Sequence, residues 1–202
     1  MGLGSYVICE LDSVQKEYPR FREAFIALEQ EAIAKCAADW FPGRPVEQVV
    51  GYLTPKAGQQ FGRTTILPAL FQDNTGTQMV TWRQYFSSTG HQRIIAGVRS
   101  GYTIPEDFKV AWIGLAFPNK QHQISEIKFQ IGDRKYGRID LEEIRRYNKP
   151  AVVFEKGFII DEEQSFELFG YVETADYQRI VMLGACYYRV IDKVLGNPGS
   201  AI

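Results

Sequence analysis

Residue types that could perform chemistry are sparse in this sequence. Its two histidines, His91 and His122, lie in or beside predicted turns, and neither has a second metal ligand two or four residues away. The three cysteines, Cys9, Cys36 and Cys186, are too few and too widely separated for a disulfide framework or a zinc site. No Gly-x-Ser-x-Gly motif marks a nucleophilic serine. The sequence therefore predicts no catalytic residue, no cofactor-binding residue and no metal ligand.

Two other patterns have ordinary structural explanations. Residues 58–65 resemble a phosphate-binding loop, but three residues separate the two glycines where four are required, Arg63 replaces lysine, and a strand is predicted where a helix is required. The acidic groups at 106–107 and 161–163 offer oxygen ligands for calcium, yet each lies at a strand junction, where solvated carboxylates are common. We interpret the first pattern as a turn and the second as surface charge.

The composition is that of a globular protein with balanced charge. Of 202 residues, 45% are hydrophobic, and 23 basic residues against 24 acidic ones give a formal net charge of -1. This balance argues against strong direct nucleic-acid binding. The longest uncharged apolar runs, 110–117 and 180–188, fall well short of the roughly 18 residues expected of a membrane helix, so no membrane insertion is predicted. The N-terminus lacks the basic and apolar regions of a signal peptide, so we expect synthesis in a cytoplasm.

The first part of the chain, residues 1–50, predicts an N-terminal arm and an amphipathic helix. Pro19 suits the start of that helix, which is expected to end near Asp39. Its apolar stripe has spacings of four, three, four and four residues: Phe21, Phe25, Leu28, Ala32 and Cys36. One amphipathic helix cannot form a core alone, so this stripe must lie on the β body or on a neighbouring subunit.

Residues 51–195 predict an antiparallel β-sandwich of about eight strands, followed by a flexible tail at 196–202. The expected strands are 64–71, 78–86, 92–99, 108–117, 123–131, 151–160, 164–172 and 178–192. A short inserted helix is expected to begin at Asp140, with Glu143 completing a capping-box-like pair. The predicted fold class is therefore mainly β.

Some predicted strands are apolar on both faces. Phe169 and Tyr171 lie opposite the face that carries Phe166 and Leu168, and residues 180–191 carry large side chains on both sides. Since a sandwich buries only the inner faces of its sheets, the outer aromatics need cover from the helix, from loops or from other copies. The candidate assembly residues are Phe21, Phe25, Leu28, Phe169, Tyr171 and Tyr187.

The strand pattern at 104–117, 152–160, 166–172 and 180–190 resembles that of single jelly-roll virion proteins. The resemblance implies an eight-stranded jelly roll, without enzymatic activity or cofactor, that tiles a capsid or similar particle. Its expected partners are copies of itself and other virion proteins, with no small-molecule substrate identified, and its expected location is the assembled particle. The chain lacks the basic arm of many such proteins, which argues against direct genome binding.

Other hypotheses stay open. A carbohydrate- or ligand-binding β-sandwich module would be favoured by a planar row of exposed aromatic residues and by a stable monomer. A cupin-like enzyme would be favoured by bound metal. A surface appendage subunit would share the apolar interfaces of a capsid protein.

Overall fold

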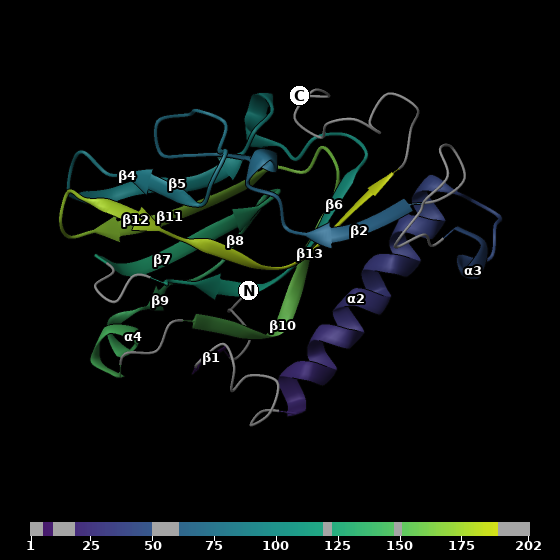
Figure 1. Ribbon diagram of the computed structural model, residues 1–202, viewed down its shortest axis with the longest axis horizontal. Helices are drawn as coiled ribbons and strands as arrows, with labels where there is room; N and C mark the ends of the chain where they lie inside the picture. The colour runs from purple at the N-terminus through teal and green to yellow at the C-terminus, as the bar shows by residue number, and fades with distance from the viewer. Residues whose placement is uncertain (1–5, 10–18, 50–60, 119–122, 148–150, 190–202) are drawn as a thin grey trace.

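The computed structural model describes residues 6–9, 19–49, 61–118, 123–147 and 151–189. Two antiparallel β-sheets face each other, and one long helix lies along the outside of one of them (Figure 1). The prediction of a mainly β fold with antiparallel sheets is confirmed. None of the helices in these ranges is both long and apolar enough to cross a membrane.

We call the two facing sheets A and B. Sheet A has the order β1 (Tyr6–Cys9), β10 (Ala151–Ile160), β6 (Phe108–Ala116), β13 (Val181–Arg189) and β2 (Phe61–Thr65). Sheet B has the order β3 (Phe71–Gln72), β5 (Gly90–Gly97), β11 (Phe166–Val172), β7 (Ile124–Ile131) and β8 (Arg134–Lys135), and β9 (Ile139–Asp140) also pairs with β7. A small separate sheet joins β12 (Tyr177–Arg179) to β4 (Arg83–Tyr85).

The space between sheets A and B is filled by aromatic side chains around Trp112. Its ring centroid lies 4.7 Å from that of Phe129, 4.9 Å from that of Phe154 and 5.3 Å from that of Phe166, all in edge-to-face geometry. The indole Nε1–H donates a hydrogen bond to the Gly114 carbonyl oxygen at 2.6 Å. The one polar atom of this large side chain is thus satisfied inside the core.

Helix α2 (Pro19–Trp40) packs on the outer face of sheet A (Figure 1). Leu28 and Cys36 are buried in the same apolar cluster as Ala111 of β6 and Tyr187 of β13. From Phe25 to Cys36, the predicted helical stripe therefore lies on the β body of its own chain. This contact also explains why β6 and β13 are apolar on both faces, because one face meets sheet B and the other meets α2.

The short elements differ from the sequence prediction. The expected strand at 64–71 ends after Thr65, and a 3-10 helix, η1 (Pro68–Leu70), follows because proline suits a first helical turn. The expected strand at 78–86 is reduced to β4. In the N-terminal arm, β1 pairs with β10, which the sequence did not predict. The remaining helices are α3 (Val46–Val49), η2 (Ser100–Tyr102) and α4 (Glu142–Tyr147).

The inserted helix α4 is confirmed where the sequence placed it. Asp140 accepts a hydrogen bond at 2.8 Å from the Glu142 backbone N–H, as expected of an acidic residue at a helix start. The predicted tail at 196–202, and the last part of the strand expected at 178–192, lie outside the described residues.

Candidate functional site

The most enclosed charge in the described part of the chain belongs to Lys109 of β6, which is 2% exposed. Its Nζ lies 2.8 Å from Asp39 Oδ2 and 3.2 Å from Asp161 Oδ1. Glu162 Oε1 is 3.7 Å away, and the Trp40 ring centroid is 5.5 Å away. These partners come from the end of α2 and from the turn between β10 and β11, so Lys109 joins both segments to sheet A.

The pKa of Lys109 reflects two opposing causes. Burial disfavours the ammonium form, but hydrogen bonds and charges from Asp39 and Asp161 outweigh it and raise the pKa above 10.5. Burial raises the pKa of the nearby Cys36 thiol to about 12, against an opposing effect of the Lys109 charge. Lys109 is therefore a charged structural group, and Cys36 stays a thiol with little nucleophilic character at neutral pH.

Three of the five acidic residues considered for calcium, Asp107, Asp161 and Glu162, have side-chain partners within the protein. Asp161 pairs with Lys35 as well as with Lys109. Glu162 accepts a hydrogen bond from the Trp40 indole at 3.0 Å, and Asp107 Oδ1 lies 2.7 Å from Arg189 Nε. Within the described ranges, no group of three or more His, Cys, Asp or Glu residues is arranged to hold a metal ion.

The outer face of sheet B carries aromatic and charged side chains together. In the register of the sheet, Tyr171 of β11 pairs with His91 of β5, and Phe169 pairs with Arg93. The His91 and Tyr171 ring centroids are 5.0 Å apart, and Lys128 of β7 places its Nζ 6.0 Å from the Phe169 ring centroid. Tyr171 is 39% exposed, so this face meets solvent.

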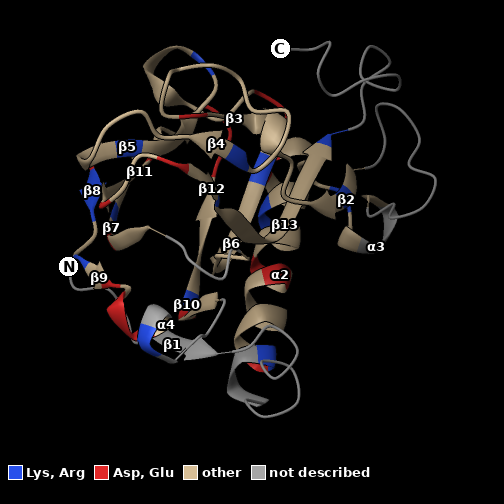
Figure 2. Cartoon of the chain, turned by 60° about the vertical axis from the view of Figure 1, so that its left-hand side comes forward, with Lys and Arg blue, Asp and Glu red and all other residues tan. Residues whose placement is uncertain are grey.

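The same combination continues beyond sheet B. The Arg93 guanidinium carbon lies 4.0 Å from the Tyr102 ring centroid. On the small sheet, the Tyr85 and Tyr177 centroids are 4.9 Å apart, and the Arg83 guanidinium carbon lies 4.1 Å from the Tyr177 centroid. A basic residue on β5 lies on this side of the molecule in Figure 2. We call the outer face of sheet B, together with β4 and β12, the aromatic–cation face.

The six predicted assembly residues fall into two groups. Leu28 and Tyr187 are buried, and Phe25 is half-buried, where α2 meets sheet A, so they make contacts within the chain instead of lining its surface. Phe169 and Tyr171 lie on the aromatic–cation face, opposite the core, as their alternation with Phe166 and Leu168 predicts. The Phe21 side chain lies outside the described part of the structure.

The sequence analysis did not place His91 and Arg93 on this face. His91 was expected in or beside a turn, and it is the second residue of β5, directly opposite Tyr171. Arg93, two residues later on the same strand, follows the alternation that places both side chains outward. His122 lies outside the described residues.

The chain matches no family model, no curated protein and no solved structure. The arrangement of its own surfaces is therefore what bears on function. Two features stand out: sheet A is covered by α2, and sheet B presents the aromatic–cation face.

Proposed function

We propose that this chain is a self-assembling structural protein, a capsid or other virion subunit, whose aromatic–cation face contacts neighbouring subunits. The observation that carries the proposal is the unequal cover of the two sheets. Helix α2 buries the outer face of sheet A, whereas Phe169 and Tyr171 remain on the outer face of sheet B, beside Lys128 and His91 respectively. Tyrosine and arginine are among the residue types enriched at the centres of protein interfaces.

The strand pairing supports a jelly-roll architecture for this subunit. β2 pairs with β13, β5 with β11, β6 with β10, and β7 with β8 and β9. In the part of the chain from β2 to β13, the first strand thus pairs with the last. Each later pair listed here lies between the two strands of the pair before it in sequence, and the innermost pair, β7 and β8, is consecutive along the chain. A long antiparallel ribbon rolled across two facing sheets produces this nesting, as in the jelly rolls of many capsid proteins.

The filled interior supports a function on the outside of the molecule. Trp112, Phe129 and Phe154 are buried between the sheets with ring centroids 4.7–5.7 Å apart. Ligand-binding barrels of similar size hold their ligands in such a space. In this chain that space is occupied by its own side chains, which suits a rigid subunit that works through its surface.

The test is assembly of the full chain, measured by light scattering and negative-stain microscopy over a range of concentrations. We expect multimers, and we expect Tyr171→Asp to reduce their mass because it places a desolvated charge in the contact. Thr65→Asp makes the same charge change at an exposed position on β2 of sheet A and should assemble like the wild type. A chain that stays single at millimolar concentration would refute the proposal, as would normal assembly of Tyr171→Asp.

A second candidate function is carbohydrate binding on the small sheet. Tyr85 is 49% exposed and Tyr177 is 50% exposed, with Arg83 beside them. Exposed aromatic rings can stack against the apolar faces of sugar rings, and a nearby guanidinium can donate hydrogen bonds to hydroxyl groups.

Affinity electrophoresis in gels containing galactomannan or hydroxyethylcellulose tests this second function. Retardation of a single-copy chain, lost in Tyr177→Ala, would favour it over assembly. Unretarded migration in both gels would count against these neutral polysaccharides as ligands.

A further inference from the structure

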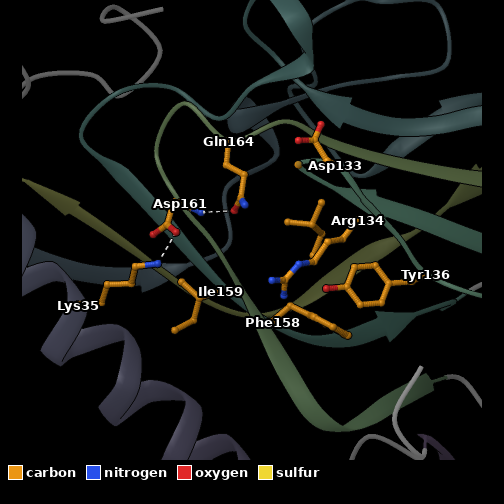
Figure 3. Close-up of a pocket in the computed structure, with 10 residues that line it drawn as sticks. Lys35, Asp133, Arg134, Tyr136, Phe158, Ile159, Asp161 and Gln164 are labelled. Atoms are coloured by element: carbon orange, nitrogen blue, oxygen red, sulfur yellow. Dashed lines mark hydrogen bonds and ion pairs between the residues drawn. The ribbon is translucent and has the colours of Figure 1, made fainter. Parts of the chain in front are cut away.

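A pocket of about 400 Å³ lies beside sheet B, at the edge of the aromatic cluster that fills the core (Figure 3). It is formed by three segments that are distant in sequence. α2 contributes Lys35, and the turn between β7 and β8 contributes residues 131–134 with Tyr136. The end of β10 and the following turn contribute Phe158, Ile159, Asp161 and Gln164. This volume is within the range of small-molecule sites.

Some polar groups in the pocket are already engaged by the protein. Lys35 pairs with Asp161, whose other carboxylate oxygen binds Lys109. The Gln164 side-chain oxygen accepts a hydrogen bond at 3.0 Å from the Asp161 backbone N–H. These contacts leave Lys35 and Asp161 close to mutual neutrality, so neither offers an unbalanced charge to a ligand.

Other polar groups are uncommitted. Among the described residues, the Arg134 guanidinium, the Tyr136 hydroxyl and the Gln164 amide nitrogen have no hydrogen-bond partner. The Arg134 and Tyr136 polar ends point toward the centre of the group drawn in Figure 3, while the Asp133 carboxylate points away from it. The available groups are therefore mainly donors, and the one carrying full charge is a guanidinium.

The wall of the pocket next to these donors is aromatic and held in place. The Tyr136 and Phe158 ring centroids are 4.8 Å apart, edge to face. Tyr136 also stacks on the buried Phe129 at 4.7 Å with an interplanar angle of 18°. Because Phe129 is fixed in the core, the Tyr136 ring and its hydroxyl have a defined orientation before any ligand arrives.

We propose that this pocket binds a small ring-shaped molecule that carries one carboxylate, such as a uronic acid. The carboxylate pairs with the Arg134 guanidinium, whose planar fork matches its two oxygens. The Tyr136 hydroxyl and the Gln164 amide donate to oxygens on the ring, and the Phe158 and Tyr136 rings pack against its apolar face. A single negative charge fits better than a dianion, because Lys35 is already neutralised by Asp161. The site is separate from the aromatic–cation face and does not depend on assembly.

The test is an NMR titration of the full chain with D-glucuronate, D-glucose and acetate. Arg134 is exposed, so the expected affinity for glucuronate is weak, with a Kd of the order of millimolar. Glucose lacks the carboxylate and acetate lacks the ring, and each should bind about tenfold more weakly. The backbone amide signals of Gly132 and Gln164 should shift on addition of glucuronate.

Arg134→Gln should weaken glucuronate binding about tenfold, since a charge-assisted contact is lost. The matched control is Lys135→Gln, which removes the same charge at the next residue of β8, exposed and outside the pocket lining. Equal binding of glucuronate and glucose would overturn the proposal. Unchanged binding by Arg134→Gln, acetate binding as tight as that of glucuronate, or no saturable binding of glucuronate would overturn it too.

Discussion

Replacing Lys109 by methionine should weaken the attachment of α2 and of the β10–β11 turn to sheet A. Methionine keeps the length and apolar stem of lysine but removes the ammonium group. That group lies 2.8 Å from Asp39, 3.2 Å from Asp161 and 3.7 Å from Glu162. Its loss leaves three carboxylates near one another without their shared cation.

The cost follows from how exposed those carboxylates are. Leaving a fully buried charge without its partner costs about 3–5 kcal/mol. Here the side chains of Asp39, Asp161 and Glu162 are 44%, 26% and 25% exposed, so water can solvate part of the charge. Asp161 also keeps Lys35, and Glu162 keeps the Trp40 indole. We therefore expect a loss of about 2 kcal/mol in the free energy of unfolding.

Urea denaturation measures this loss. With a slope of about 2 kcal/mol per molar urea, the midpoint of Lys109→Met should fall by about 1 M with the slope unchanged. Lys156→Met, on an exposed residue of β10, is the control and should stay within about 0.5 kcal/mol of the wild type. A midpoint for Lys109→Met equal to that of the control would refute the assignment of Lys109 as the joint between α2 and sheet A.

The stabilising effect of the Lys109 ammonium group should disappear at alkaline pH. The folded-state pKa of Lys109 is raised above 10.5, so its contribution is complete below that pH and is lost as the pH rises through the folded pKa. The stability difference between wild type and Lys109→Met should therefore be constant from pH 7 to about pH 10 and shrink above it. A difference that shrinks already near pH 8 would contradict this.

Two further substitutions test the packing of α2 by urea denaturation. Leu28→Asp, at a position 5% exposed, should lower the free energy of unfolding by about 3 kcal/mol or more. Ile26→Asp, at a position 43% exposed on the same helix, should change it by about 0.5 kcal/mol or less. Equal losses would mean that α2 presents a different face to sheet A. Gly157→Ala should cost about 2 kcal/mol, because its Cβ would lie 2.3 Å from Leu28 Cδ2 and 2.8 Å from the Trp112 carbonyl oxygen. Gly137→Ala, with no atom within 4 Å of the added Cβ, is the matched control, and a wild-type midpoint for Gly157→Ala would show that α2 sits farther from β10.

The long elements could be predicted because their residues repeat with a clear period. The apolar stripe containing Leu28 and Cys36 predicts α2, and the alternation of Ile127 and Phe129 with Glu126 and Lys128 predicts the two faces of β7. Such patterns predict which face of an element is buried, because they are a local property of the sequence. They do not predict which other element packs against that face.

The elements that the sequence did not reveal depend on distant partners. β1 exists as a strand because residues 6–9 pair with residues 151–154 of β10. In the sequence, Lys109 resembles an ordinary surface lysine at the start of an apolar run. Its burial is favourable only because Asp39 and Asp161, which belong to other segments, lie beside its ammonium group. Pro68 gives a local signal, since it lacks a backbone N–H for a strand, and it could have ended the predicted strand earlier.

The attachment of α2 decides where a partner can bind. Lys109 and the Leu28 contact hold the helix on sheet A, so the stripe from Phe25 to Cys36 is covered within the chain. Among the described residues, the exposed aromatic side chains lie on sheet B, the small sheet and η2. A neighbouring subunit would cover the wide outer face that includes Tyr171, while a sugar would need little more than the rings near Tyr177. Tyr171→Asp should therefore impair assembly and spare glycan binding, and Tyr177→Ala should do the reverse. If both variants lose the same activity, the aromatic–cation face is one site.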